Sequence, residues 1–418
     1  MSQIRLLTCL ALISATLCVI YSNPVNAYAP PAGPIFNNPS NHPNGPSATI
    51  IQDRIETMID HAPKGSTIRI VTLRFDLKST LNALRRAHNR GVIVRFVIPD
   101  VHAKDPYVVG LARNLNKRSF KGDTSYVAYC HLACYADAPS SVLHPKIYMF
   151  SQTGTARHVV MTSSANLTHN MVSRAYNDAY TAVGDAAIYT NMRRYFDGMR
   201  DDKTPRANPH RTFSMQSGRL VYEYFPDTQS PLGKDSYSRI FDSITCTGAA
   251  KTGGDGNGHT VVSVVTPLWA GSRTDLARRL VYLHRRGCVV NVLVATAGTD
   301  AVVMKTLLDG GVTVRDSAKF NRAGKRILYA HSKYIAISGV YGANRTANTV
   351  FTGSANMSRV GVTASDNVLV RIKNSPATYR DYKRNFNYIW RDSTPVTAAT
   401  ALRAPVIDDT TERQLDDE

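Results

Sequence analysis

Two long segments of the chain, residues 66–100 and 259–296, share one pattern of apolar and polar positions. Each begins with an apolar run, continues with apolar residues at helical spacing, and reaches an Arg-Gly pair before a second apolar run. Gly91 and Gly287 stand where a helix would be capped, and the runs after them are apolar and β-branched enough for strands buried on both faces. Each segment therefore predicts a β-α-β unit.

The repetition extends to both sides of these units. An amphipathic helix is predicted before each unit, and two further apolar or small-residue segments recur after it. A polar stretch near residues 205–215 separates the two copies. The matching segments of the first and second copy are 48–66 with 235–246, 142–152 with 329–339, and 161–170 with 351–360.

A histidine and a lysine stand two positions apart in one of the repeated runs, "ILYAHSKYIAISG". We expect a strand here, and alternation along a strand places His331 and Lys333 on one face. A single His-x-Lys is more often a solvated strand face than a site. The first copy carries the same pair, His144 and Lys146, and this duplication makes the motif strong.

Each copy continues with Ser-Ala-Asn, which begins 18 residues after the lysine in the first copy and 21 in the second, and then with an acid. In this order the residues resemble the phospholipase D superfamily, whose signature is H-x-K-x4-D followed by G-S-x-N, carried twice around one active site. The further candidate residues are Ser164, Asn166 and Asp178 in the first copy and Ser354, Asn356 and Asp366 in the second.

The resemblance covers nearly the whole mature chain and looks closest to the secreted actinobacterial phospholipase D-like proteins. It implies a duplicated α/β fold with two mixed sheets flanked by helices. The two halves would pack about a pseudo-two-fold axis, with the site at their seam. We expect the first half at 28–210, the second at 211–400, and an acidic disordered tail at 401–418.

The chemistry explains the residue types independently. Cleaving a phosphodiester without metal or other cofactor requires a nucleophile, an acid for the leaving oxygen, and cations or hydrogen-bond donors for the other oxygens. Histidine suits the first two tasks because it titrates near neutrality. The lysines would neutralise developing charge, and the motif serines and asparagines would donate hydrogen bonds.

The resemblance implies that His144 is the nucleophile and His331 the general acid, although the symmetry of the motifs leaves the opposite assignment open. Asp178 and Asp366 are candidates to fix the imidazole tautomers; the alternative is that they are solvated loop residues or capping groups. The signature's aspartate is replaced in the two copies by Ser151 and Ser338.

The start of the chain resembles a secretory signal. Arg5, an apolar run and a small-residue ending at Ala27 form its three parts, so residues 1–27 are predicted to be removed and the protein secreted. An uncleaved anchor is the alternative, but the run is shorter than the ~20 residues of a spanning helix. No other stretch of that length is free of charges, so no transmembrane segment is expected.

Four cysteines remain after the signal, and in an exported protein they predict two disulfides. Cys130 with Cys134 and Cys246 with Cys288 are the natural pairs; zinc ligation is the weaker alternative. The formal net charge of +19 favours phosphate-bearing partners, either nucleic acid or an anionic membrane surface.

These observations predict a monomeric, metal-independent phospholipase D-type enzyme. It would hydrolyse glycerophospholipids at a membrane surface through a phosphohistidine, and an alcohol in place of water would give transphosphatidylation. A non-specific endonuclease of the same superfamily and a catalytically silent lipid- or nucleic-acid-binding homologue are the alternatives. The sequence does not choose the head group.

Overall fold

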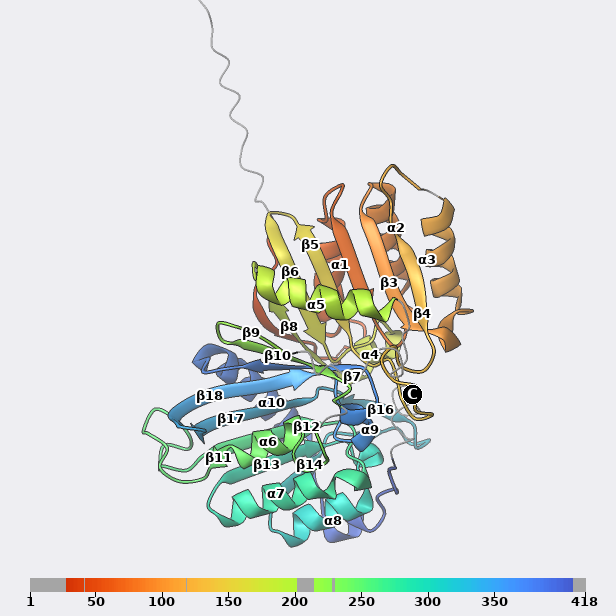
Figure 1. Cartoon of the computed structure of the whole chain (residues 1–418). Coiled ribbons are helices and arrows are strands. Elements are labelled where there is room, and N and C mark those ends of the chain that lie inside the picture. The colour runs from red at the N-terminus through yellow and green to blue at the C-terminus, as the bar shows by residue number, and fades with distance from the viewer. Residues whose placement is uncertain (1–27, 41, 118, 201–213, 228–229, 409–418) are drawn as a thin grey trace, which may run out of the picture.

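The structure, a computed structural model, describes residues 28–40, 42–117, 119–200, 214–227 and 230–408 (Figure 1). The expected signal, the centre of the predicted boundary and residues 409–418 of the expected tail lie outside this part. Residues 401–408 are described, and Ile407 in this stretch is buried, with its N–H donating to a carboxylate oxygen of Asp300.

The first half contains a seven-stranded mixed sheet in the order β1-β8-β6-β5-β2-β3-β4. Strands β2, β3 and β4 run parallel and their other neighbours antiparallel. The strands are β1 (Gly33–Phe36), β2 (Thr67–Val71), β3 (Ile93–Pro99), β4 (Tyr126–Cys130), β5 (Ile147–Thr153), β6 (Ala156–Ser163) and β8 (Asp178–Ala182), and the helices are α1 (Pro46–Asp60), α2 (Lys78–Asn89), α3 (Pro106–Lys117), α4 (His169–Ser173) and α5 (Ala186–Met199).

The second half contains a ten-stranded mixed sheet, ordered β20-β14-β13-β12-β17-β18-β19-β10-β9 with β11 paired to β17. Its strands are β9 (Ser214–Ser217), β10 (Leu220–Phe225), β11 (Ile244–Thr245), β12 (Val261–Thr266), β13 (Val289–Val294), β14 (Thr313–Asp316), β17 (Tyr334–Tyr341), β18 (Asn344–Gly353), β19 (Asn367–Ile372) and β20 (Thr394–Pro395), and its helices are α6 (Ser236–Asp242), α7 (Thr274–Arg285), α8 (Ala301–Asp309), α9 (Arg359–Thr363), α10 (Pro376–Asp392) and α11 (Ala398–Ala401).

Both predicted β-α-β units are present. In each, two parallel strands flank a helix that ends just before Gly91 or Gly287, whose φ angles of 88° and 94° favour glycine. The preceding helices are shorter than predicted. The helix expected over 48–66 spans Pro46–Asp60, and the one expected over 235–246 ends at Asp242 because the chain then enters β11.

The two halves form one body with a shared core. One apolar cluster contains side chains of both large sheets, among them Met149 of β5 and Tyr334 of β17. A third, small sheet also joins the halves: β7 (Ala175–Tyr176) of the first runs parallel to β16 (Arg326–Ala330) of the second, which pairs with β15 (Lys319–Phe320). Figure 1 shows β7 and β16 at the junction. The sequence did not predict this sheet.

The four cysteines form the two expected disulfides, Cys130–Cys134 and Cys246–Cys288. Their sulfur atoms are therefore bonded to each other and do not serve as zinc ligands. In the part of the chain that the structure describes, no helix is long and apolar enough to cross a membrane.

Candidate active site at the seam of the two halves

Both His-x-Lys pairs lie in short breaks between strands, not inside strands as the sequence predicted. Residues 331–333 separate β16 from β17, and residues 144–146 precede β5. In the second half the chain leaves the small sheet and enters the large one at this break. The N–H groups of His331 and Ser332 both donate to the carbonyl oxygen of Tyr176, at 2.8 and 3.0 Å, so the break is held by the first half.

Each histidine side chain is hydrogen-bonded by a residue of the other half. Nδ1 of His144 lies 2.8 Å from Oδ1 of Asn367, and Nδ1 of His331 lies 3.0 Å from Oδ1 of Asn177. Both histidines are buried. This exchange of equivalent contacts is what a pseudo-two-fold relation between the halves requires, and it brings both motifs to the seam.

The orientation of each asparagine amide follows from its other contacts. Nδ2 of Asn177 donates to the carbonyl oxygens of Met171 and Ala175, at 3.0 and 3.1 Å, and Nδ2 of Asn367 donates to that of Gly361 at 2.9 Å. Oδ1 therefore faces the imidazole and can only accept. Nδ1 of each histidine must therefore carry the proton of the neutral ring, which leaves Nε2 unprotonated.

The two motif lysines are buried beside their own histidines. Nζ of Lys146 donates to the carbonyl oxygen of His144 at 2.7 Å, and Nζ of Lys333 donates to that of His331 at 2.9 Å. Nζ of Lys333 also lies 2.9 Å from Nε2 of His331. In the second half a positive charge thus lies next to Nε2 of His331, where it would meet the oxygens of a bound phosphate.

The motif serines contact the orienting asparagines. Oγ of Ser164 donates to Oδ1 of Asn177 at 2.9 Å, and Oγ of Ser354 donates to Oδ1 of Asn367 at 2.7 Å. The sequence predicts that these hydroxyl groups donate to substrate oxygens. In the structure each donates to the residue that positions the opposite histidine, and that of Ser164 also lies 3.3 Å from the carbonyl oxygen of Asp178.

The motif asparagines, Asn166 and Asn356, are both buried. Oδ1 of Asn166 accepts from Oγ1 of Thr72 at 3.5 Å. Among the described residues, Nδ2 of Asn166 has no hydrogen-bond partner although it is shielded from solvent. A buried amide with unused donors costs free energy unless a ligand accepts from it, which suits the substrate-binding role expected for this residue.

Asp178 does not make the Nδ1 hydrogen bond that we expected from it, because Asn177 makes it. One carboxylate oxygen of Asp178 accepts instead from the hydroxyl groups of Thr352 and Tyr382. Burial raises the pKa of Asp178, and the two hydrogen bonds and the charge of Lys333 partly oppose the shift.

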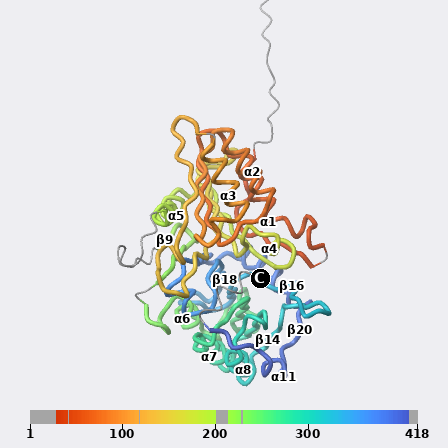
Figure 2. The backbone as a smooth tube through the Cα atoms, turned by 90° about the vertical axis from the view of Figure 1, so that its right-hand side faces the viewer, coloured from red at the N-terminus to blue at the C-terminus, as the bar shows by residue number. Residues whose placement is uncertain are grey.

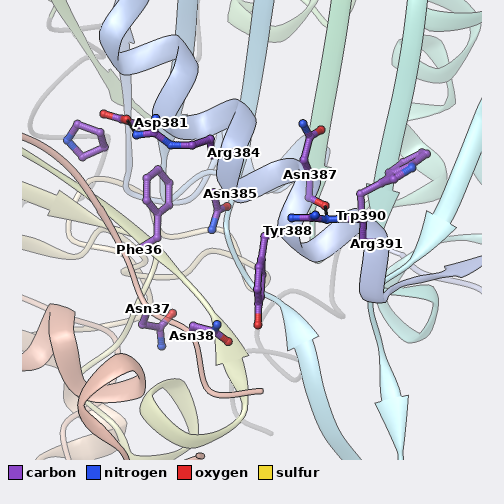
Figure 3. A pocket seen from close by; sticks show the side chains of 11 residues that line it. Phe36, Asn37, Asn38, Asp381, Arg384, Asn385, Asn387, Tyr388, Trp390 and Arg391 are labelled. Carbon is purple, nitrogen blue, oxygen red and sulfur yellow. Dashed lines mark hydrogen bonds and ion pairs between the residues drawn. The ribbon is translucent and has the colours of Figure 1, made fainter. Parts of the chain in front are cut away.

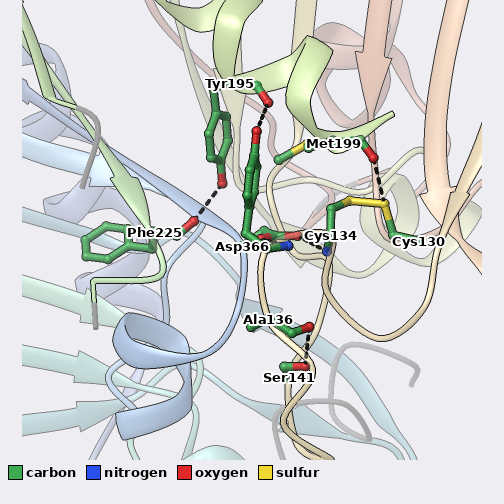
Figure 4. Close-up of a disulfide and its surroundings, with 9 residues drawn as sticks. Cys130, Cys134, Ala136, Ser141, Tyr195, Met199, Phe225 and Asp366 are labelled. Carbon is green, nitrogen blue, oxygen red and sulfur yellow. Dashed lines mark hydrogen bonds between the residues drawn. A yellow bond between two sulfur atoms is a disulfide. The ribbon is translucent and has the colours of Figure 1, made fainter. Parts of the chain in front are cut away.

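Asp366 likewise does not make the hydrogen bond to Nδ1 of His144, because its neighbour Asn367 makes it. Its carboxylate accepts the backbone N–H groups of Cys134 and Tyr135, at 2.6 and 3.1 Å, beside the Cys130–Cys134 disulfide (Figure 4). Its carbonyl oxygen accepts the N–H of His144 at 3.2 Å. Asp366 therefore fastens the disulfide loop of the first half next to His144.

The two orienting asparagines are structural counterparts, whereas the two acids are not. The motif serine accepts the N–H of Asp178 in the first half and that of Val368 in the second, so these two positions correspond. Asn177 precedes one acid and Asn367 follows the other. Sequence reasoning selected the acids for their charge and missed the asparagines, although "YNDAY" and "SDNVL" each contain one.

A further supporting residue, Asn37, was also missed. Its Oδ1 accepts the N–H of Asn177 at 2.6 Å, and its Nδ2 donates to the carbonyl oxygen of Ala175 at 3.0 Å. Asn37 also lines a pocket of about 750 Å³ between β1 and α10, which contains Tyr388 and Arg384 (Figure 3). That pocket is not lined by either His-x-Lys motif.

The serines that replace the signature's aspartate make structural hydrogen bonds. Oγ of Ser151 accepts the N–H of Thr67 at 2.8 Å, and Oγ of Ser338 accepts that of Gly254 at 3.0 Å. Both contacts connect a strand to a neighbouring segment. A hydroxyl group can supply them because it accepts a hydrogen bond without a charge, and that of Ser338 also donates to Oδ1 of Asn348 at 3.2 Å.

The fold and the crossed histidine contacts define a duplicated α/β protein in which each half supplies the asparagine bonded to the motif histidine of the other. A family comparison matches residues 55–200 and 257–390 to the family described as "Cardiolipin synthase, PLD-like domain". The two matched segments cover more than half of the chain, one in each half, so the chain belongs to this family of phospholipase D-like proteins. No curated protein sequence matches the chain.

Solved structures share the fold. Phosphatidylserine synthase from Haemophilus influenzae Rd KW20 is 12% identical with a TM-score of 0.56, over 84% of this chain and 86% of that one. Polyphosphate kinase from Porphyromonas gingivalis is 12% identical with a TM-score of 0.55, over 83% of this chain and 46% of the kinase chain. At these identities the likeness shows the fold alone.

Proposed function

We propose that this chain is a secreted, monomeric phosphodiesterase of phospholipase D type that hydrolyses glycerophospholipids to phosphatidate and an alcohol. The observation that carries the proposal is the pair of crossed hydrogen bonds, His144 to Asn367 and His331 to Asn177. They favour the same tautomer in both motifs, in which Nε2 of each neutral ring is unprotonated.

In the first step of this mechanism, Nε2 of His144 attacks phosphorus while His331, protonated, gives its Nε2 proton to the leaving alcohol oxygen. The phosphorus–oxygen bond breaks as the nitrogen–phosphorus bond forms. Lys146 and Lys333 neutralise charge on the non-bridging oxygens, and Nδ2 of Asn166 donates a hydrogen bond to one of them.

In the second step, His331 is neutral and takes a proton from water, which attacks the phosphohistidine. The nitrogen–phosphorus bond breaks, His144 becomes neutral again and phosphatidate leaves. An alcohol in the place of water would give transphosphatidylation by the same path. The same residue serves as acid and then as base, as in other two-step transfers.

Substrate class and compartment rest on further features. The net charge of +19 suits an anionic phospholipid surface, and the two disulfides together with the signal-like pattern of residues 1–27 suit an oxidising extracellular environment. The same charge also favours nucleic acid, so an endonuclease is the second candidate.

The test is release of the head-group alcohol from mixed phospholipid vesicles in EDTA, beside cleavage of plasmid DNA. The mature protein is compared with His144→Ala and His331→Ala. His259→Ala is the matched control, because that histidine is partly exposed and pairs with Asp255 outside the motifs. We expect lipid turnover that both motif variants abolish and the control retains.

Three other outcomes would overturn parts of the proposal. DNA cleavage alone, lost in the same two variants, would keep the mechanism and replace the substrate. Turnover that survives both motif variants would place the chemistry elsewhere. Lack of turnover of either substrate by the wild-type protein would favour a catalytically silent homologue.

A further inference from the structure

The hairpin formed by β15 and β16 has an unusual combination of side chains. Its ten residues, 319–328, contain four cations and no acid. Two large apolar side chains on it are exposed, Phe320 at 48% and Ile327 at 44%. Single exposed apolar residues need no explanation, but two of them within one basic hairpin indicate an interaction surface.

The hairpin turn is ordered by its own hydrogen bonds. Oδ1 of Asn321 accepts the N–H groups of Ala323 and Lys325, both at 3.0 Å, and the N–H of Asn321 donates to the carbonyl oxygen of Lys325 at 2.9 Å. Gly324 takes the left-handed conformation, with a φ of 74°. The exposed side chains are thus presented by a preformed turn.

Two cations of the hairpin are available to a partner. Arg322 and Lys325 are exposed and, within the described residues, form no ion pair. Lys319 pairs with Asp392, and the guanidinium of Arg326 lies 3.9 Å from the ring centroid of Tyr329. The outer end of the hairpin therefore combines uncompensated positive charge with exposed apolar surface.

The hairpin leads directly into the candidate active site. Strand β16 ends at Ala330, one residue before His331, and the ring of Tyr329 packs edge-on against the imidazole with 5.8 Å between centroids. Figure 2 shows β16 and the cyan hairpin at the side of the molecule, beside the junction of the halves. A surface bound at the hairpin would lie close to the seam.

A pocket of about 690 Å³ lies beside the hairpin. It is lined by Ile327 and Lys319 of the hairpin and by Tyr388, Arg391 and Asp392 of α10. Asp392 pairs with Lys319, so Arg391, beside an aromatic and an aliphatic side chain, is the lining cation that suits the phosphate of a lipid at this surface.

We propose that the hairpin 319–328 docks this protein onto an anionic phospholipid surface, with Phe320 and Ile327 in the acyl boundary and Arg322 and Lys325 among the head-group phosphates. This deepens the proposed function and rests on it for the identity of the substrate. A lipid surface is favoured over nucleic acid by Ile327, which gains from an apolar phase but offers no ring for base stacking, whereas the ring of Phe320 suits either partner.

The test measures binding of the full mature protein to vesicles of phosphatidylcholine with and without phosphatidylglycerol. The variant Phe320→Ser/Ile327→Ser should bind both vesicles at least about tenfold more weakly. The variant Arg322→Gln/Lys325→Gln should lose about fivefold for each cation on anionic vesicles and little on neutral ones. Unchanged melting temperatures would show that the exposed substitutions leave the fold intact.

Matched controls are available on the far helices of the second half. Val302→Ser removes a 59%-exposed apolar side chain from α8, and Arg285→Gln/Arg286→Gln removes two exposed cations at the end of α7. Both controls should bind vesicles as the wild type does. An equal loss of vesicle binding in the controls would show that net charge or non-specific hydrophobic adsorption, and not this hairpin, drives binding.

A soluble substrate separates the two proposals. A short-chain glycerophospholipid below its micelle concentration should be hydrolysed equally by the wild type and both hairpin variants. Undiminished vesicle binding in those variants, with turnover intact, would overturn the docking surface alone. Hairpin-dependent binding without turnover would overturn the proposed function alone. Loss of oligonucleotide binding in place of vesicle binding would make the hairpin a nucleic-acid contact.

Discussion

Nδ1 of His144 donates a hydrogen bond to Oδ1 of Asn367, 2.8 Å away, and the asparagine belongs to the other half of the chain. The amide cannot turn round without placing its NH₂ group against the ring and its oxygen against the carbonyl oxygen of Gly361. The contact is neutral, unlike the carboxylate that we expected behind the ring. It fixes the tautomer without adding a negative charge to the site.

We predict that Asn367→Ala and Asn177→Ala each lower kcat by about 10²–10⁴-fold and change KM little, because the imidazole loses its fixed tautomer while the lysines remain. Initial rates of phosphodiester hydrolysis over a range of substrate concentrations measure this split. Near-ultraviolet circular dichroism would verify the fold. A change confined to KM would show that the asparagines act on binding and not on the histidines.

The charge of the contact can be tested separately. In Asn367→Asp a carboxylate would stand beside the imidazole of His144 and stabilise its protonated form, so the pH–activity profile should move to higher pH. The isosteric change keeps the acceptor for Nδ1. A profile that falls in height but keeps its position would mean that the variant disturbs the packing of Asn367 against Gly361 and not the charge.

The nucleophile can be identified by trapping. A diester with a good leaving group needs no acid for the first step, so His331→Ala should still be labelled on His144 and should release the label slowly. His144→Ala should carry no label. Mass spectrometry of acid-labile histidine phosphorylation distinguishes the two sites, and label on His331 in the reverse experiment would exchange the assigned roles.

The duplication could be predicted from the sequence because both copies keep the same apolar periods and the glycines at 91 and 287. The motif residues could be predicted for the same reason, because each occurs in both copies. The breaks at 144–146 and 331–333 could not be predicted, because the residues on both sides of each break follow the alternating pattern of one continuous strand. At 331–333 the chain leaves the small sheet that contains β7 and β16 and enters the large one, which only the structure shows.

The misassigned acids have a different cause. Charge is a visible signal in a sequence, whereas a neutral acceptor is recognised only when its partners are in place. Asn177 and Asn367 differ from many other asparagines only by the carbonyl oxygens that hold their amides. The contact also crosses between halves, so no spacing along the chain encodes it.

Asp178 gives a prediction on stability. Burial raises the pKa of this carboxyl above its ordinary value of 3.8. A raised pKa means that the folded state binds the proton more tightly, so the group's contribution is complete below about pH 4 and is lost as the pH rises through the folded pKa. The side-chain amide introduced in Asp178→Asn does not titrate, so this variant does not lose stability for this reason as the pH rises.

The free energy of unfolding of Asp178→Asn, relative to wild type, should therefore increase with pH from about pH 4 and then level off. Urea unfolding from pH 4 to pH 8 measures the difference. Asp309→Asn is the control, because that carboxylate is exposed and pairs with Lys305. A difference that decreases with pH would show that the charge of Lys333 outweighs the burial of Asp178.

The two disulfides should contribute differently to the free energy of unfolding and to activity. Cys246 and Cys288 are 42 residues apart, and Cys130 and Cys134 only 4. Loop-closure entropy then predicts that Cys246→Ala/Cys288→Ala lowers the free energy of unfolding by about 4 kcal/mol and Cys130→Ala/Cys134→Ala by about 2 kcal/mol. Urea unfolding gives both values.

Activity should show the opposite order, because the short loop lies against the site. Asp366 holds the N–H of Cys134, and the N–H of Leu143, next to His144, donates to the carbonyl oxygen of Leu132 in the same loop. Under conditions where both variants are folded, kcat should fall more in Cys130→Ala/Cys134→Ala. Equal activity of the two variants would mean that the Asp366 contact alone fixes the position of His144 and that the disulfide adds nothing to it.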